Sequence, residues 1–105
     1  MKVIRTTLVT PLQGADDEVV KILGEIGEHM AKQPGFIEAY TFEEDGKIGR
    51  LSMWESREDA DHAANQLHTM ALRSRMNALT LPAREERLLE IRSERHGVAA
   101  KRKAA

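Results

Sequence analysis

The side chains of this sequence that could move a proton near neutral pH are its four histidines. An unperturbed imidazole has a pKa of about 6.5, so it can accept or release a proton at that pH. His62 and His68 are six residues apart, whereas metal ligands on one helix face are three or four apart, so the pair does not indicate a metal site. His29 follows Glu25 by one helical turn, and we expect a surface pair between them.

Other kinds of chemistry have no counterpart in the sequence. The chain has no cysteine, which excludes disulfides and thiolate nucleophiles. It contains no glycine-rich phosphate loop, no EF-hand pattern and no Ser-His-Asp order. We therefore expect neither a metal nor another cofactor.

Length and charge favour a single soluble domain. A chain of 105 residues can build one modest core. The net charge of −1 argues against a nucleic-acid footprint over the domain. No apolar run approaches the roughly 20 residues of a membrane span, and the opening MKVIRTTLVT lacks the apolar stretch of a signal peptide. We expect a cytoplasmic protein that binds neither nucleic acid nor membrane.

Positive charge gathers at the C-terminal end of the chain. From position 92 onward five basic residues stand against Glu94 alone, a local charge of +4, so the preceding part carries about −5. We divide the chain into a domain over residues 1–92 and a basic, flexible tail over residues 93–105. Docking of this tail on an acidic partner is one hypothesis.

Four runs of residues have the composition of β-strands. They span residues 3–9, 36–42, 48–54 and 86–91. Asp45-Gly46 separates the second run from the third and is a strong hairpin signal, because a type I′ turn needs positive φ at both central positions. These two strands should pair antiparallel.

Two helices are predicted between the strands. An apolar stripe of Val19, Leu23, Ile26 and Met30 marks the first helix. Ser56 can cap the second by accepting a hydrogen bond from the amide three residues later.

The second helix has two candidate buried faces. Leu72, Met76 and Leu79 form one stripe, and small residues form another, rotated by more than a quarter turn. Two stripes predict either a break near residues 68–70 or a second contact surface. The small-residue stripe consists of Ala60, Ala63, Ala64, Leu67, Ala71, Ser74 and Ala78.

The order of these elements predicts an α+β fold. Strand, helix, strand, strand, helix, strand is the ferredoxin-like arrangement with an antiparallel sheet. Apolar residues occur at both parities of the strands: Phe36 and Tyr40 alternate with Ile37 and Ala39. A sheet covered by helices on one face should be wetter on the other, so we expect the same face of a second copy to cover it in a homodimer.

The segment QPGFIEAYTFEEDGKIGRLSMWESREDADHAANQLH, residues 33–68, resembles the antibiotic biosynthesis monooxygenase (ABM) domain family of dimeric α+β barrels. The resemblance lies in Pro34-Gly35-Phe36, in Trp54-Glu55-Ser56 and in the acidic, alanine-rich helix that follows. It implies a ferredoxin-like domain over residues 1–92, homodimers formed through the sheets, and a pocket between the sheet and the second helix.

The resemblance also implies an activity. The family includes small cofactor-independent monooxygenases that act on aromatic hydroquinones or polyketide-type substrates. Quinol-oxidising members often have histidines nine and fourteen positions after the tryptophan, where this chain has Ala63 and His68. His68 is thus the candidate catalytic base that would form a phenolate able to pass an electron to O2; capping or flanking a helix break is the alternative. Haem degradation is not expected, because Arg73 stands where haem-degrading members place their proximal histidine.

The predicted substrate contacts surround an aromatic ring. Trp54 and Tyr40 would bind the ring, and Leu72 and Met76 would supply apolar walls. Packing in the core is the other interpretation of Trp54, and the two are compatible because an indole can pack on one face and present the other. The alternative for the whole protein is a non-catalytic dimeric barrel that binds a small apolar ligand.

Overall fold

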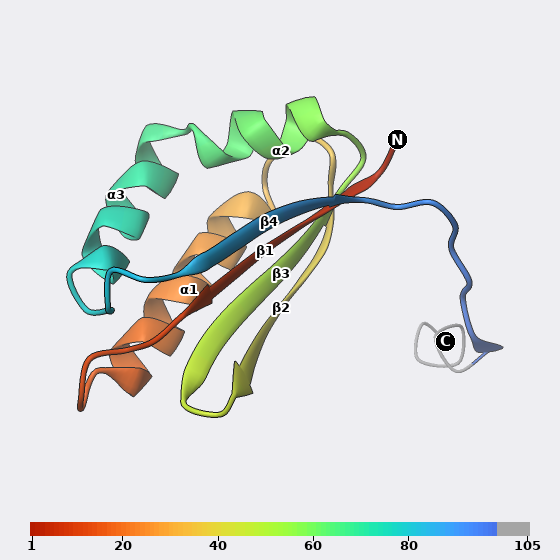
Figure 1. The fold of residues 1–105 in the computed structure, drawn as a ribbon. Helices are drawn as coiled ribbons and strands as arrows, with labels where there is room; N and C mark the ends of the chain where they lie inside the picture. The colour runs from red at the N-terminus through yellow and green to blue at the C-terminus, as the bar shows by residue number, and fades with distance from the viewer. Residues whose placement is uncertain (99–105) are drawn as a thin grey trace.

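The computed structural model describes residues 1–98, which fold into one antiparallel sheet covered by helices on one face (Figure 1). The strands lie in the order β2-β3-β1-β4. The elements are β1 (Val3–Val9), α1 (Asp16–Met30), β2 (Phe36–Glu44), β3 (Lys47–Trp54), α2 (Arg57–Ala64), α3 (Leu67–Asn77) and β4 (Glu85–Glu90). The ferredoxin-like α+β prediction is confirmed.

Local chemistry sets the ends of these elements. Asp45 and Gly46 both have positive φ, at 45° and 80°, so the predicted hairpin turn between β2 and β3 is confirmed. Ser56 Oγ accepts a hydrogen bond from the amide of Asp59 at 3.1 Å, which caps α2 as expected.

The second helix breaks three residues earlier than predicted. α2 ends at Ala64, and Gln66 is extended before α3 begins. The hydroxyl of Thr69 donates to the carbonyl oxygen of Ala63 at 2.9 Å, which satisfies a buried acceptor at the end of α2. The break changes which stripe is buried: α3 packs through Leu72 and Met76, so the predicted small-residue face continues only as far as Ala64.

The core lies between the sheet and the helices. Pairing of Val3 with Trp54 and of Val9 with Ile48 places these four side chains on the helix-covered face. The apolar stripe of α1 packs against them, together with Leu72 and Met76 of α3. The stripe consists of Val19, Ile22, Leu23, Ile26 and Met30.

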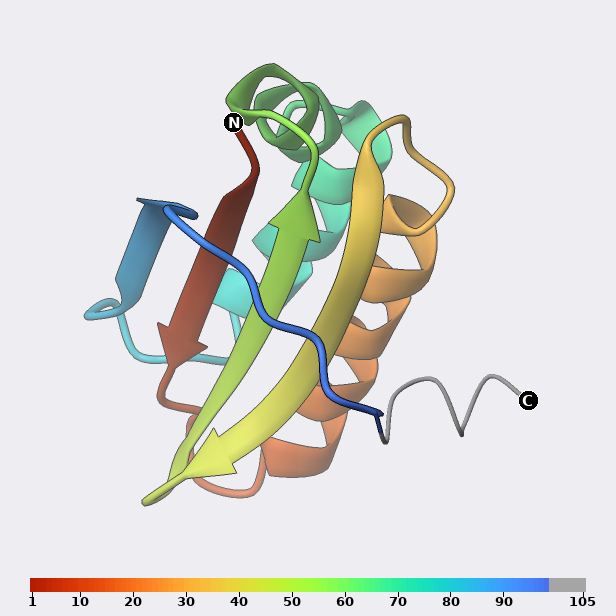
Figure 2. The same ribbon diagram turned by 90° about the vertical axis from the view of Figure 1, so that its right-hand side faces the viewer.

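The helices of residues 1–98 that pack on the sheet all lie on one side of it, which leaves its other face open (Figure 2). This face carries apolar side chains. Tyr40 is 57% exposed and Phe42 is 37% exposed. The strand register places five further apolar side chains on this face: Ile4, Leu8, Leu51, Met53 and Leu89. We call these seven residues the open sheet face.

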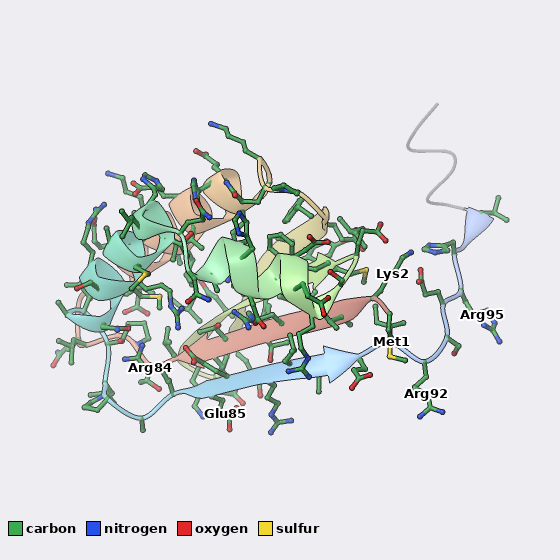
Figure 3. The ribbon with its side chains drawn as sticks, turned by 90° about the horizontal axis from the view of Figure 1, so that it is seen from above. Met1, Lys2, Arg84, Glu85, Arg92 and Arg95 are labelled. Atoms are coloured by element: carbon green, nitrogen blue, oxygen red, sulfur yellow. The ribbon has the colours of Figure 1, made fainter. Side chains whose placement is uncertain are left out.

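After β4 the chain turns away from the helices. Figures 1 and 2 show this segment leaving the domain on the side of the open sheet face. The ammonium of Lys2 pairs with the carboxylate of Glu94 at 3.0 Å, and Arg92 and Arg95 extend beyond the end of β4 (Figure 3). Residues 99–105 of the predicted basic tail lie outside the described residues.

Candidate functional site

A cavity of about 310 Å³ lies between the sheet and the helices. Its lining comes from β1, β3 and β4, mostly from their helix-covered face, and α1, α2 and α3 complete it. The lining residues are Arg5, Thr7, Leu23, Ile26, Met30, Arg50, Ala64, Arg73, Met76, Glu86, Arg87 and Leu88.

Arg50 is the buried cation of this cavity. It faces the helices because it pairs across the sheet with Thr7, which also lines the cavity. Only 5% of Arg50 is exposed. Its Nη1 donates to the sulfur of Met30 at 3.3 Å, a weak acceptor, and its Nε has no hydrogen-bond partner. Among residues 1–98 no carboxylate forms an ion pair with it.

Two more guanidinium groups border the same cavity. Arg5 pairs with Asp61 of α2 at 2.9 Å, and Arg73 of α3 pairs with Glu86 of β4 at 3.4 Å. Burial, together with the charges of Arg5 and Arg73, lowers the pKa of Arg50 to about 10. Arg50 therefore stays protonated at neutral pH. Arg87 also contributes to the lining, but it pairs across the sheet with Thr6 and so has the parity of the open sheet face. The three guanidiniums on the helix-covered side exceed the two carboxylates by one positive charge.

The sequence-predicted ring contacts lie in different parts of the molecule. Met76 lines the cavity, whereas Leu72 is buried in the core beside it without being part of the lining. Trp54 is fully buried: its Nε1–H donates to the hydroxyl of Ser52 at 2.9 Å, and its ring packs edge-to-face on Phe36 at 5.4 Å. Trp54 is thus a core residue and contributes no wall to this cavity.

Tyr40 lies on the open sheet face. Its hydroxyl donates to the carboxylate of Glu38 at 2.8 Å, and this hydrogen bond raises the pKa of Tyr40. Tyr40 also borders a second, more open hollow of about 540 Å³ between α1 and β2, which Arg50 reaches from the other side. The strand parity that brings Arg50 to the cavity therefore turns Tyr40 away from it.

The predicted base, His68, lies at the exposed start of α3. Its ring packs against that of His29 with centroids 4.5 Å apart. Burial lowers the pKa of His29, and the nearby His68 and Lys32 lower it further. Glu25, the expected partner of His29, pairs instead with Arg75 at 3.3 Å. Neither His68 nor Trp54 is among the residues that line the cavity.

Solved structures with the same fold support the resemblance found in the sequence. SnoaB, a cofactor-independent oxygenase from Streptomyces nogalater, superimposes with a TM-score of 0.78 at 21% identity, over 89% of this chain and 95% of that one. Rv0793 from Mycobacterium tuberculosis gives 0.81 at 16% identity, over 90% and 98%. A structure described as an antibiotic biosynthesis monooxygenase gives 0.75 at 17% identity, over 85% and 97%. This chain has the fold of the antibiotic biosynthesis monooxygenases. The sequence matches no protein-family model and no curated protein.

Within this monooxygenase fold, the arginines of the cavity are the residues that the sequence interpretation missed. The strand pattern of the sequence contains a signal that could have identified two of them. Arg5 has the same parity as Val3 and Val9, and Arg50 has the same parity as Ile48 and Trp54. A charged residue at the core parity of two neighbouring strands is unusual enough to mark a site.

Two features are absent from residues 1–98 of this fold. No three histidine, aspartate or glutamate side chains converge as ligands of a metal ion would. None of the helices in this part of the chain is both long enough and apolar enough to cross a membrane.

Proposed function

We propose that this protein is a small cofactor-independent monooxygenase that oxidises a phenol or hydroquinone in the cavity beside Arg50. The observation that carries the proposal is the buried guanidinium at the wall of a cavity whose lining also includes the apolar side chains of Leu23, Ile26 and Met76. The fold shared with SnoaB, which is described as a cofactor-independent oxygenase, supports it.

The proposed role of Arg50 is electrostatic. A positive charge in a site shielded from water lowers the pKa of a bound phenol and stabilises the phenolate. The phenolate passes one electron to O2, and the resulting superoxide and phenoxyl radical combine at a ring carbon. Loss of water from the hydroperoxide leaves a carbonyl. One oxygen atom then remains in the product and the other leaves as water.

Oxygen transfer to a naphthol tests this function. A panel of naphthols and hydroxynaphthoates would be incubated with the protein under isotopically labelled O2. From 1-naphthol we expect 1,4-naphthoquinone with one labelled oxygen, formed at a rate well above the reaction without protein. Arg50→Met should lower this rate by about a hundredfold or more, the usual effect of removing one preorganised charge donor.

The control is Arg57→Met. Arg57 is exposed on the first turn of α2, away from the cavity lining, so its loss should leave the rate unchanged. If no member of the panel yields labelled product while the protein is folded, the monooxygenase proposal fails. The non-catalytic binding protein then becomes the better description.

We further propose that the open sheet face pairs with the same face of a second copy, which would complete a dimeric α+β barrel. The exposed aromatic side chains of Tyr40 and Phe42 support this, because a contiguous apolar face on a small domain indicates an interaction surface. In a dimer with two-fold symmetry, the same surface of each copy forms the interface.

A further inference from the structure

Arg50 has more hydrogen-bonding capacity than the protein uses. A guanidinium carries five N–H donors. The contact of Nη1 with the Met30 sulfur and the unpartnered Nε leave this group poorly satisfied. Burying a cation without a carboxylate is costly, so the position favours a ligand that brings the missing acceptor.

The charges around the cavity indicate how much charge the ligand carries. Arg5 and Arg73 already have carboxylate partners, Asp61 and Glu86. Arg87 has the parity of the open sheet face, so on the helix-covered side only the charge of Arg50 remains to be balanced. A single negative charge would do so, whereas a dianionic phosphate would leave an excess of negative charge.

The shape of a guanidinium favours one kind of anion. Its planar fork matches the two oxygens of a carboxylate, which can accept two parallel hydrogen bonds. A phenolate has a single oxygen and cannot fill both sites. Arg50 is therefore better suited to a carboxylate than to a phenolate alone.

Part of the wall is suited to a ring. Leu23, Ile26 and Met76 of the helices and Leu88 of β4 contribute apolar side chains to the lining. A volume of about 310 Å³ is near the small end of ligand pockets. It suits a compact ring system with few substituents.

From these observations we propose that the cavity binds a small aromatic monocarboxylate, with its carboxylate on Arg50 and its ring against Leu23 and Met76. The inference rests on the proposed function and deepens it by naming the substrate class. The carboxylate takes two of the five N–H donors of Arg50 and holds the ring in place. The remaining donors can hydrogen-bond the phenol oxygen of a hydroxynaphthoate, so Arg50 keeps the role proposed above, and the carbon that reacts with O2 lies elsewhere on the ring.

The test compares two probes of nearly equal shape and different charge. Binding of 1-naphthoate and 1-naphthamide would be measured by titration calorimetry without O2, since neither probe is oxidised. We expect 1-naphthoate to bind about tenfold tighter or more, because a hydrogen bond between two charged groups is stronger than one to a neutral amide. The same titration with 1-naphthol should give the weaker affinity of the amide.

The variants assign the preference to Arg50. Arg50→Met should remove the preference for 1-naphthoate, and Arg57→Met should keep it. Thermal unfolding of each variant without ligand checks that it is folded. We expect Arg50→Met to be at least as stable as the natural chain, because an unpaired buried charge is replaced by an apolar side chain of similar length.

Three results would overturn the inference: equal affinity for the naphthoate and the amide, a preference unchanged in folded Arg50→Met, or 1-naphthol binding as tightly as 1-naphthoate. Failure of the proposed function looks different. In that case 1-naphthoate binds with the expected preference, yet no hydroxynaphthoate takes up labelled oxygen.

Discussion

Two buried side chains with polar atoms, Trp54 and Arg50, lie on the same face of β3 and have different roles. The N–H of Trp54 is satisfied by Ser52, and its ring is enclosed by the core. No polar atom of Trp54 is left to meet a ligand. Arg50 is also enclosed, but its Nε is unpartnered and its charge is unpaired within the described residues. At the residue scale, Trp54 is part of the core, and Arg50 is the residue to which we assign binding in the proposal.

The histidine predicted as a base has its own test. His68 does not line the cavity, so we expect His68→Ala to keep kcat for 1-naphthol within about twofold of the natural value. The same substitution should raise the pKa of His29 toward its ordinary value, because His68 is one of the charges that lower it. Proton NMR titration of the ring signals measures that shift. A loss of kcat of about a hundredfold at unchanged affinity would instead establish His68 as the general base.

At the scale of elements, the break between α2 and α3 decides which side chains reach the cavity. A continuous helix would have kept the small-residue stripe against the sheet. The extended Gln66 and the bond from Thr69 to the Ala63 carbonyl reorient the chain, and Met76 is brought to the cavity wall. Part of each stripe is therefore buried: the small residues of α2 before the break, and Leu72 and Met76 of α3 after it.

Close packing of α2 on the start of β2 predicts an unequal effect of two glycine substitutions. Gly35 and Gly14 both have φ of 81°. A methyl group on Gly35 would collide with the side chain of Asp59, whereas the space around Gly14 is open. We expect Gly14→Ala to lower the free energy of unfolding by about 1 to 2 kcal/mol through backbone strain alone. Gly35→Ala should lower it clearly more, as measured by urea unfolding. Equal losses would show that Asp59 moves aside without cost.

At the scale of the whole molecule, one face of the sheet is covered by the helices and the other is open. The helices bury the face that carries Trp54 and Arg50. The open sheet face instead presents Phe42, which packs over Gly49 and leaves no room for a side chain there. The apolar side chains of the open sheet face are therefore left for the second sheet of the proposed dimer.

Association of two copies predicts different behaviour for two apolar residues. Phe42→Asp places a charge in the open sheet face and should convert a dimer to a monomer, because an interface core does not tolerate an unpaired charge. Leu67→Asp is the matched control: Leu67 is 85% exposed at the start of α3, so its replacement should leave the dimer intact. Light scattering coupled to gel filtration gives both masses. A natural chain that is monomeric at micromolar concentration would refute the dimer.

The sequence by itself determined the elements and their order. Turn residues at Asp45-Gly46, the cap at Ser56 and the apolar stripe of α1 are local signals, and the helices and strands they predict were found within a few residues. Only the tertiary structure decided the site. Strand register brings Arg5 and Arg50 to one cavity, and His68 does not line it. Spacing within a segment specifies local structure, but convergence of side chains from separate segments depends on pairing and packing over the whole fold.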